Sequence, residues 1–147
     1  MFALFDLPAL LIAGVAVDVE PFYVLEFNVS GLQPHGFLHS YVGSSFLAFL
    51  VAAIVYPLRH VLNRIMTAFR LPQESPFKKI LFTSFIGVYS HVFLDSFLYS
   101  EMNPLYPLQG NPFVSMLSAY GNYSVIYGFC GVTFFLGIIL YVYKIIR

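Results

Sequence analysis

The chain has 147 residues, of which 59% are hydrophobic and only 10% are charged. Soluble domains carry about 25% charged residues, so this composition excludes an ordinary water-exposed surface and favours an integral membrane protein. Seven basic residues balance seven acidic ones, and the sequence has no basic patch with interleaved aromatic residues, so we expect no nucleic-acid partner. The length suits a single domain over residues 1–147.

Apolar stretches separated by polar or proline-containing segments define the expected helices. The first stretch, residues 2–17, is shorter than the roughly 20 residues that a helix needs to cross a bilayer core of about 30 Å. Three further stretches reach that length: 37–56, 76–99 and 124–143. We therefore predict an all-α polytopic membrane helical bundle, with three full transmembrane helices plus a short N-terminal helix.

Two connecting segments show the periodicity of interfacial amphipathic helices. In 58–70 the apolar side chains share one face and the arginines lie off it, which is typical of a helix attracted to anionic lipid. In 113–120 apolar residues recur with helical spacing, and Gly121 would end the helix: Phe113, Met116, Leu117 and Tyr120.

The basic residues predict the orientation in the membrane. All seven lie either between Arg59 and Lys79 or at the C-terminus, in Lys144 and Arg147. Basic loops favour the cytoplasmic side. The 57–79 loop and the C-terminus are therefore expected in the cytoplasm, and the two intervening spans return the chain to that side. We expect the protein to be integral to the cell (plasma or inner) membrane.

This topology gathers most of the ionisable residues at the non-cytoplasmic side. His35 and His39 are four residues apart at the mouth of a predicted helix, so they would share one face. His91 and Asp95 repeat this spacing near the end of the next span. Asp18 and Glu20 follow the first apolar stretch and, if extended, would point to the same side.

These six residues predict a metal site. An ionisable group within a membrane span is costly and therefore indicates function. Imidazole and carboxylate ligands together suit zinc best, with iron or manganese as alternatives, rather than calcium. A proton or ion relay through the same residues, or structural hydrogen bonding, are the competing interpretations.

Small residues recur on two predicted spans and would let the helices approach closely. If the two stripes faced each other, His39 and His91 would come together. The stripes are Ser40, Ser44, Ala48 and Ala52 on one span and Ser84, Gly87, His91 and Asp95 on the next.

Three motifs carry a family resemblance: Val-Asp18-Val-Glu20-Pro, Pro-His35-Gly-Phe-Leu-His39-Ser40, and Tyr-Ser90-His91-Val-Phe-Leu-Asp95-Ser96, the last followed by Asn103-Pro104-Leu105-Tyr106-Pro107-Leu108. In this order they resemble the membrane-bound metal-dependent hydrolases, small integral membrane proteins that include inner-membrane hydrolases described as LexA-binding. The resemblance covers roughly residues 10–110. It implies hydrolysis, with the six residues as metal-site or catalytic positions. Members of that family usually carry a further N-terminal segment with a His, which we expect to be missing here.

The leading hypothesis is a membrane-embedded metal-dependent hydrolase with its site at the non-cytoplasmic interface. Glu20, which has the longer reach, is the expected general base. A lipid or lipid-linked ester is the expected substrate, because the site lies at headgroup depth, and membrane lipids are the expected partners. The alternatives are a metal or proton transporter, and a non-enzymatic scaffold with a structural metal.

Overall fold

The computed structural model describes residues 4–146, and every regular element within that range is helical. The predicted all-α class is therefore confirmed for these residues. The elements are α1 (Leu7–Ala16), α2 (Val19–Glu26), the 3₁₀ turn η1 (Phe37–His39), α3 (Tyr41–Ala68), α4 (Phe77–Ser96), the 3₁₀ turn η2 (Ser118–Tyr120) and α5 (Asn122–Ile146). Residues 2 and 3 of the predicted helix 2–17 lie outside the described residues.

Three described segments are long and apolar enough to cross a membrane: Leu7–Glu26, Tyr41–Ala68 and Asn122–Ile146. The last two correspond to the predicted spans 37–56 and 124–143. The first joins the short helix α1 to α2, so the N-terminal apolar run reaches 20 residues. The predicted span 76–99 is present as the helix α4, but it is absent from this set because its composition is more polar, with two lysines in its first turn and Asp95 in its last.

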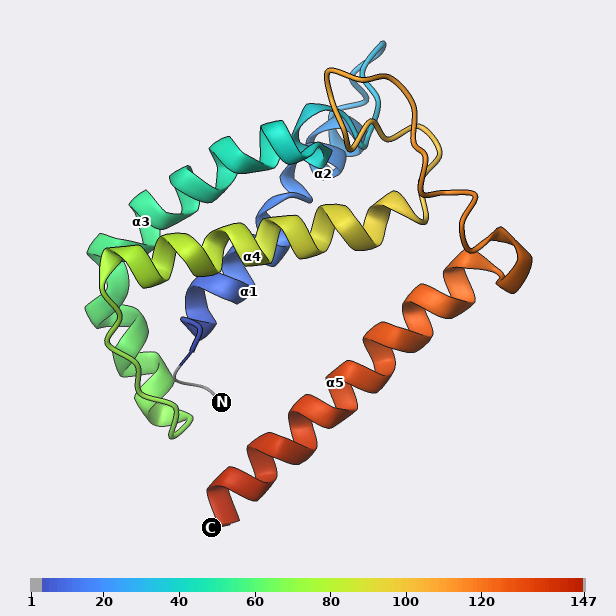
Figure 1. The fold of residues 1–147 in the computed structure, drawn as a ribbon. Coiled ribbons are helices and arrows are strands. Elements are labelled where there is room, and N and C mark those ends of the chain that lie inside the picture. The colour runs from blue at the N-terminus through green and yellow to red at the C-terminus, as the bar shows by residue number, and fades with distance from the viewer. Residues whose placement is uncertain (1–3, 147) are drawn as a thin grey trace.

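Pro57 lies inside α3 instead of ending it, so the predicted interfacial helix 58–70 is the continuation of one 28-residue helix. Proline lacks the N–H for the bond to residue 53, and its ring crowds the carbonyl of that residue, which bends a helix without necessarily stopping it. Figure 1 shows the result: the first half of α3 lies beside α4, and the second half turns away from it.

The core is formed where α1, α3 and α4 pack together, each against the other two. Ala9 and Ala13 of α1 are fully buried. Gly87 of α4 meets this small-residue face so closely that an added Cβ would lie 2.7 Å from the Ala13 Cβ and 2.9 Å from the Leu10 carbonyl oxygen. Gly87 thus packs against α1, which differs from the expectation that its stripe faces α3.

Aromatic side chains also make contacts across the interface between α3 and α4. Tyr41 contacts Tyr89 and Phe49 contacts Phe85, both edge-to-face with ring centroids about 5 Å apart. The Ser45 hydroxyl is hydrogen-bonded to the Tyr89 hydroxyl at 2.7 Å. The small stripe of α3 is nevertheless buried, since Ser44, Ala48 and Ala52 are fully inaccessible.

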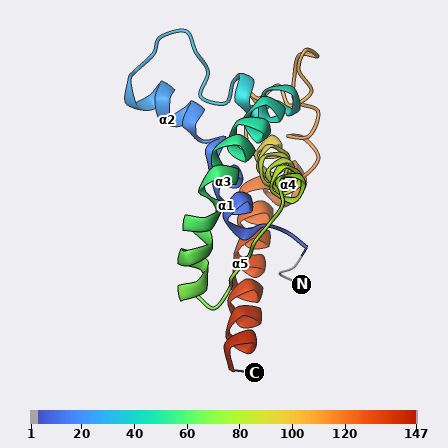
Figure 2. The same ribbon diagram turned by 90° about the vertical axis from the view of Figure 1, so that its left-hand side faces the viewer.

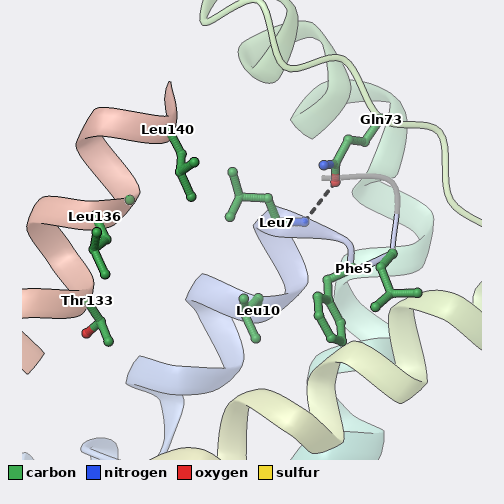
Figure 3. Close-up of a pocket in the computed structure, with 9 residues that line it drawn as sticks. Phe5, Leu7, Leu10, Gln73, Thr133, Leu136 and Leu140 are labelled. Atoms are coloured by element: carbon green, nitrogen blue, oxygen red, sulfur yellow. Dashed lines mark hydrogen bonds between the residues drawn. The ribbon is translucent and has the colours of Figure 1, made fainter. Parts of the chain in front are cut away.

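Polar contacts fix the start of α1 against the rest of the molecule. The buried Asp6 carboxylate caps α1 by accepting from the Ala9 N–H, and the Asp6 N–H donates to the Thr83 hydroxyl of α4. The Leu7 N–H donates to the Gln73 side-chain oxygen at 2.8 Å (Figure 3). The entry of α1 is therefore held beside the loop that precedes α4.

Helix α5 stands apart from the other helices in Figure 1 and runs behind them in Figure 2, and Ile126 is its one buried residue among those described. An apolar groove of about 550 Å³ separates it from α1. Leu7 and Leu10 line one side of this groove, and Thr133, Leu136 and Leu140 line the other (Figure 3). An apolar surface of this extent is expected for a helix that faces lipid.

The predicted interfacial helix 113–120 is not formed; the segment consists of turns and ends in the short 3₁₀ turn η2. The Asn111 and Asn122 side-chain amides donate to carbonyl oxygens of the α4 C-terminal region, including those of Ser96 and Phe97. Phe113 also packs against Phe97, with ring centroids 5.9 Å apart. These tertiary contacts hold the segment in turns in spite of its helical periodicity.

Candidate metal centre

His91 and Asp95 lie in the last two turns of α4, four residues apart on one face. The His91 Nε2 atom is 3.1 Å from the Asp95 Oδ2 atom. Both side chains are less than one-fifth exposed. This pairing follows from the helix repeat alone and agrees with the spacing noted in the sequence.

Asp18 comes to this pair from the junction between α1 and α2. It is the N-cap residue of α2, but its side chain makes no capping hydrogen bond and is directed to His91, with Asp18 Oδ1 3.3 Å from His91 Nε2. The segment after it is helical and not extended, so Asp18 and Glu20 do not act as the parallel pair that alternation predicted. Because the helix breaks at Val17–Asp18, Asp18 contacts His91 whereas Glu20 contacts His39.

His39 is positioned by the η1 turn, not by the first turn of α3. Ser40 is the N-cap of α3 and accepts from the Gly43 N–H, so the helix begins only after His39. The Glu20 carboxylate accepts from the Leu38 and His39 backbone N–H groups and lies 2.9 Å from the His39 Nδ1 atom. A proton on Nδ1 would leave the lone pair on Nε2, on the opposite side of the ring.

That Nε2 atom of His39 faces the α4 pair, 3.8 Å from the Asp95 Oδ2 atom. His39 is fully buried. The Nε2 atoms of both His39 and His91 are buried, and neither makes a hydrogen bond of normal geometry within the described part of the chain, although His91 Nε2 lies within ion-pair distance of Asp95 and Asp18. Buried imidazole nitrogens are normally paired, and a metal ion between the two rings and Asp95 would be a partner for both.

Four side chains thus form one group, which we call the Asp/His cluster: Asp18, His39, His91 and Asp95. One ligand atom from each lies within 4.8 Å of those of the other three. Two imidazoles and a carboxylate are a donor set that zinc, iron and manganese accept. The convergence of these donors, with both Nε2 atoms buried, fits a bound metal ion.

The other two predicted ligands, Glu20 and His35, lie beside the Asp/His cluster and not within it. Glu20 contacts His39 on the side away from Asp95. His35 precedes η1 and lies outside any helix, and its ring meets the His39 ring edge-to-face at a centroid distance of 4.8 Å. His35 and Glu20 thus lie next to the Asp/His cluster, and the fold decides which partners they contact.

His35 has two partners that sequence reasoning did not assign to the site. Its Nδ1 atom is 2.9 Å from the Glu101 Oε1 atom, and its ring stacks on the Tyr99 ring at 3.7 Å. Neither Glu101 nor Tyr99 is among the six residues that the sequence predicted for the site. The sequence carries little indication of these contacts, because no spacing motif links the loop after α4 to residue 35.

The structure and its polar cluster define the class of protein: a helical integral membrane protein with an Asp/His cluster at one end of its packed helices. Within that class, the chain belongs to the YdjM inner membrane protein family, whose model matches residues 4–146. No curated protein and no solved structure matches the chain. Membership supports the predicted location in the inner membrane, and the metal-dependent hydrolase part of the sequence resemblance stays a prediction.

Proposed function

We propose that this protein is a membrane-embedded metal-dependent hydrolase whose divalent metal, zinc in the first place, is bound by His39, His91 and Asp95. The observation that carries the proposal is the convergence of two buried Nε2 atoms on the Asp95 carboxylate, at 3.8 Å for His39 and 3.1 Å for His91, with no hydrogen bond of normal geometry to either atom. Two histidines and one carboxylate form a ligand set of known catalytic zinc sites, in which a fourth position stays open.

Within the Asp/His cluster, Asp18 is the residue best suited to act as general base. Its side chain is 51% exposed, whereas Asp95 is 18% exposed and His39 is fully buried. Glu20, the base expected from the sequence, already accepts from two backbone N–H groups and lies against the His39 ring. We therefore assign Glu20 the role of orienting His39 and Asp18 the role of holding a proton from water.

The chemistry follows from these assignments. A bound divalent metal supplies Lewis-acid polarisation and lowers the pKa of a water toward about 7. Asp18 takes a proton from the attacking water and later returns it to the leaving group. His39 and His91 stay neutral and fixed in orientation, His39 through Glu20. The site lies at one end of the helices, which suits a lipid or lipid-linked ester.

The first experiment is metal analysis of protein purified in mild detergent without chelator. We expect about one transition-metal ion per chain in the wild type and its loss in His39→Ala and His91→Ala. His60→Ala is the matched control, since His60 is exposed in the second half of α3 and distant in sequence from the cluster. A wild-type protein without stoichiometric metal would overturn the proposal.

A second experiment separates a hydrolase from a scaffold with a structural metal. If all four residues of the Asp/His cluster bound the metal, they would fill a tetrahedral coordination sphere and leave no position for water. If Asp18 is the base, Asp18→Asn should retain the metal and lose at least about 100-fold in kcat on ester substrates, the usual contribution of general base catalysis. Loss of the metal in Asp18→Asn would instead favour the closed structural site.

A further inference from the structure

An apolar groove of about 450 Å³ lies beside the Asp/His cluster, between the α1–α2 segment and the first half of α3. This volume is within the range of small-molecule sites. Its lining is almost entirely apolar and includes Val19, Leu38, Phe46, Leu50 and Ile54. It is distinct from the groove in Figure 3, which lies between α1 and α5.

One end of this groove is lined by residues that adjoin the candidate metal centre in the chain. Val19 lines it and lies between Asp18 and Glu20 in the chain. Leu38 lines it too, and its backbone N–H donates to the Glu20 Oε1 atom at 3.1 Å. A molecule in the groove would therefore begin next to the carboxylate that holds His39.

The other end runs along α3 into the apolar part of the molecule. From Phe46 to Ile54 a helix rises about 12 Å. Both of these side chains are more than half exposed, at 66% and 51%, so the groove is open along its side to surrounding lipid. A long, narrow and laterally open apolar groove suits a flexible hydrocarbon chain that enters from the bilayer.

The charges around the site indicate which kind of head group the bound hydrocarbon chain would carry. Proteins bind phosphate groups mainly with Arg and Lys. Here the nearest lysines on α4, Lys78 and Lys79, lie in its first turn, about 20 Å along the helix from His91. The four residues of the Asp/His cluster include neither Arg nor Lys, so the cluster offers no cationic side chain of the kind that binds a phosphate head group.

We infer that the groove binds the acyl chain of a carboxylic ester lipid with an uncharged head group, so that its ester carbonyl lies at the Asp/His cluster. This inference rests on the proposed hydrolase function. In the reaction, the oxygen of water bonds to the acyl carbon and the bond from that carbon to the alkoxy oxygen breaks. The alkoxy oxygen takes a proton, giving a free fatty acid and an alcohol.

Binding can be tested without any turnover. The protein is reconstituted in phosphatidylcholine vesicles with a non-hydrolysable ether analogue of a monoacylglycerol that carries a diazirine in its alkyl chain. After photolysis, we expect labels concentrated on groove residues of α1 and α3. Leu50→Trp should reduce this labelling at least tenfold. Leu136→Trp, an equally exposed leucine in the groove between α1 and α5, should leave it unchanged. Labelling spread evenly over the lipid-facing helices would overturn the inference.

Hydrolysis of soluble esters then distinguishes failure of the groove from failure of the proposed function. From butanoyl to octanoyl esters, kcat/KM should rise tenfold or more, because each buried methylene contributes a factor of about four. Leu50→Trp should abolish this preference while retaining the metal. Hydrolysis without any chain-length preference would contradict acyl-chain binding in the groove but would still support the proposed hydrolase function. Labelling concentrated on the groove without hydrolysis would support acyl-chain binding and contradict the hydrolase function.

Discussion

At the scale of single residues, Glu20 is the side chain whose surroundings say most about its role. Its two carboxylate oxygens accept from the backbone of Leu38 and His39, and Oε2 also contacts the His39 ring. A carboxylate bonded to a histidine on the side away from a metal fixes the ring and raises its basicity as a ligand. The role argued for Glu20 is therefore one of positioning.

The first prediction concerns this role. Glu20→Ala should weaken metal binding about 10- to 100-fold, as loss of such an orienting group commonly does. Glu20→Gln should recover part of the affinity, because its amide oxygen can still accept from the backbone. Competition titration with a chelator measures both. Glu26→Gln, an exposed acid on the same helix, is the control and should bind metal like the wild type.

At the scale of elements, the crossing of α1 and α4 decides whether Asp18 and His91 can meet. Gly87 allows this crossing, because any Cβ at that position would meet Ala13 and the Leu10 backbone. His91 lies one turn further along α4, and Asp18 lies just beyond α1. The close approach of the two helices thus brings two ligands from different segments together.

The second prediction follows from this crossing. Gly87→Ala should destabilise the protein by about 1–3 kcal/mol through overpacking, in spite of the better helix propensity of alanine. Gly137→Ala on α5 is the matched control, since an added Cβ there meets nothing within 4 Å. It should leave the stability unchanged or raise it by up to about 1 kcal/mol. Thermal unfolding in detergent compares the two, and equal stability of both variants would contradict the packing argument.

At the scale of the whole molecule, the cluster connects three parts of the chain: the α1–α2 junction, the η1 turn and the end of α4. A metal that binds only the folded state stabilises it by mass action. At a metal concentration a hundredfold above the dissociation constant, this contribution is about 2.7 kcal/mol.

The third prediction is that a chelator lowers the unfolding temperature of the wild type by several degrees, as expected for a loss of that size. His60→Ala should show the same shift. His91→Ala should begin at the lower temperature and show no further change with chelator. The prediction is contradicted if metal analysis shows that the chelator removed the ion from the wild type and the unfolding temperature does not change. The metal would then not connect these three segments.

The fourth prediction concerns orientation. In a Cys130→Ser background, Gln109→Cys should react with a membrane-impermeant maleimide added to intact spheroplasts, because the loop after α4 is expected outside. Glu74→Cys, in the basic loop, should react only after the membrane is permeabilised. Both positions are exposed, so access and not burial decides the result. The reverse labelling would place the Asp/His cluster on the cytoplasmic side.

The sequence by itself determined the helical class, the approximate spans and the proximity of His91 to Asp95. Apolar length and periodicity are local properties, and the His91–Asp95 pair needs only the helix repeat. Tertiary structure decided the rest. The bend at Pro57, the turns at 113–120 and the contacts of Asp18 with His91, Glu20 with His39 and His35 with Glu101 all depend on packing between distant segments. No spacing rule relates residues 19 to 73 positions apart, because their distance is fixed only when α1, α3 and α4 pack around small residues.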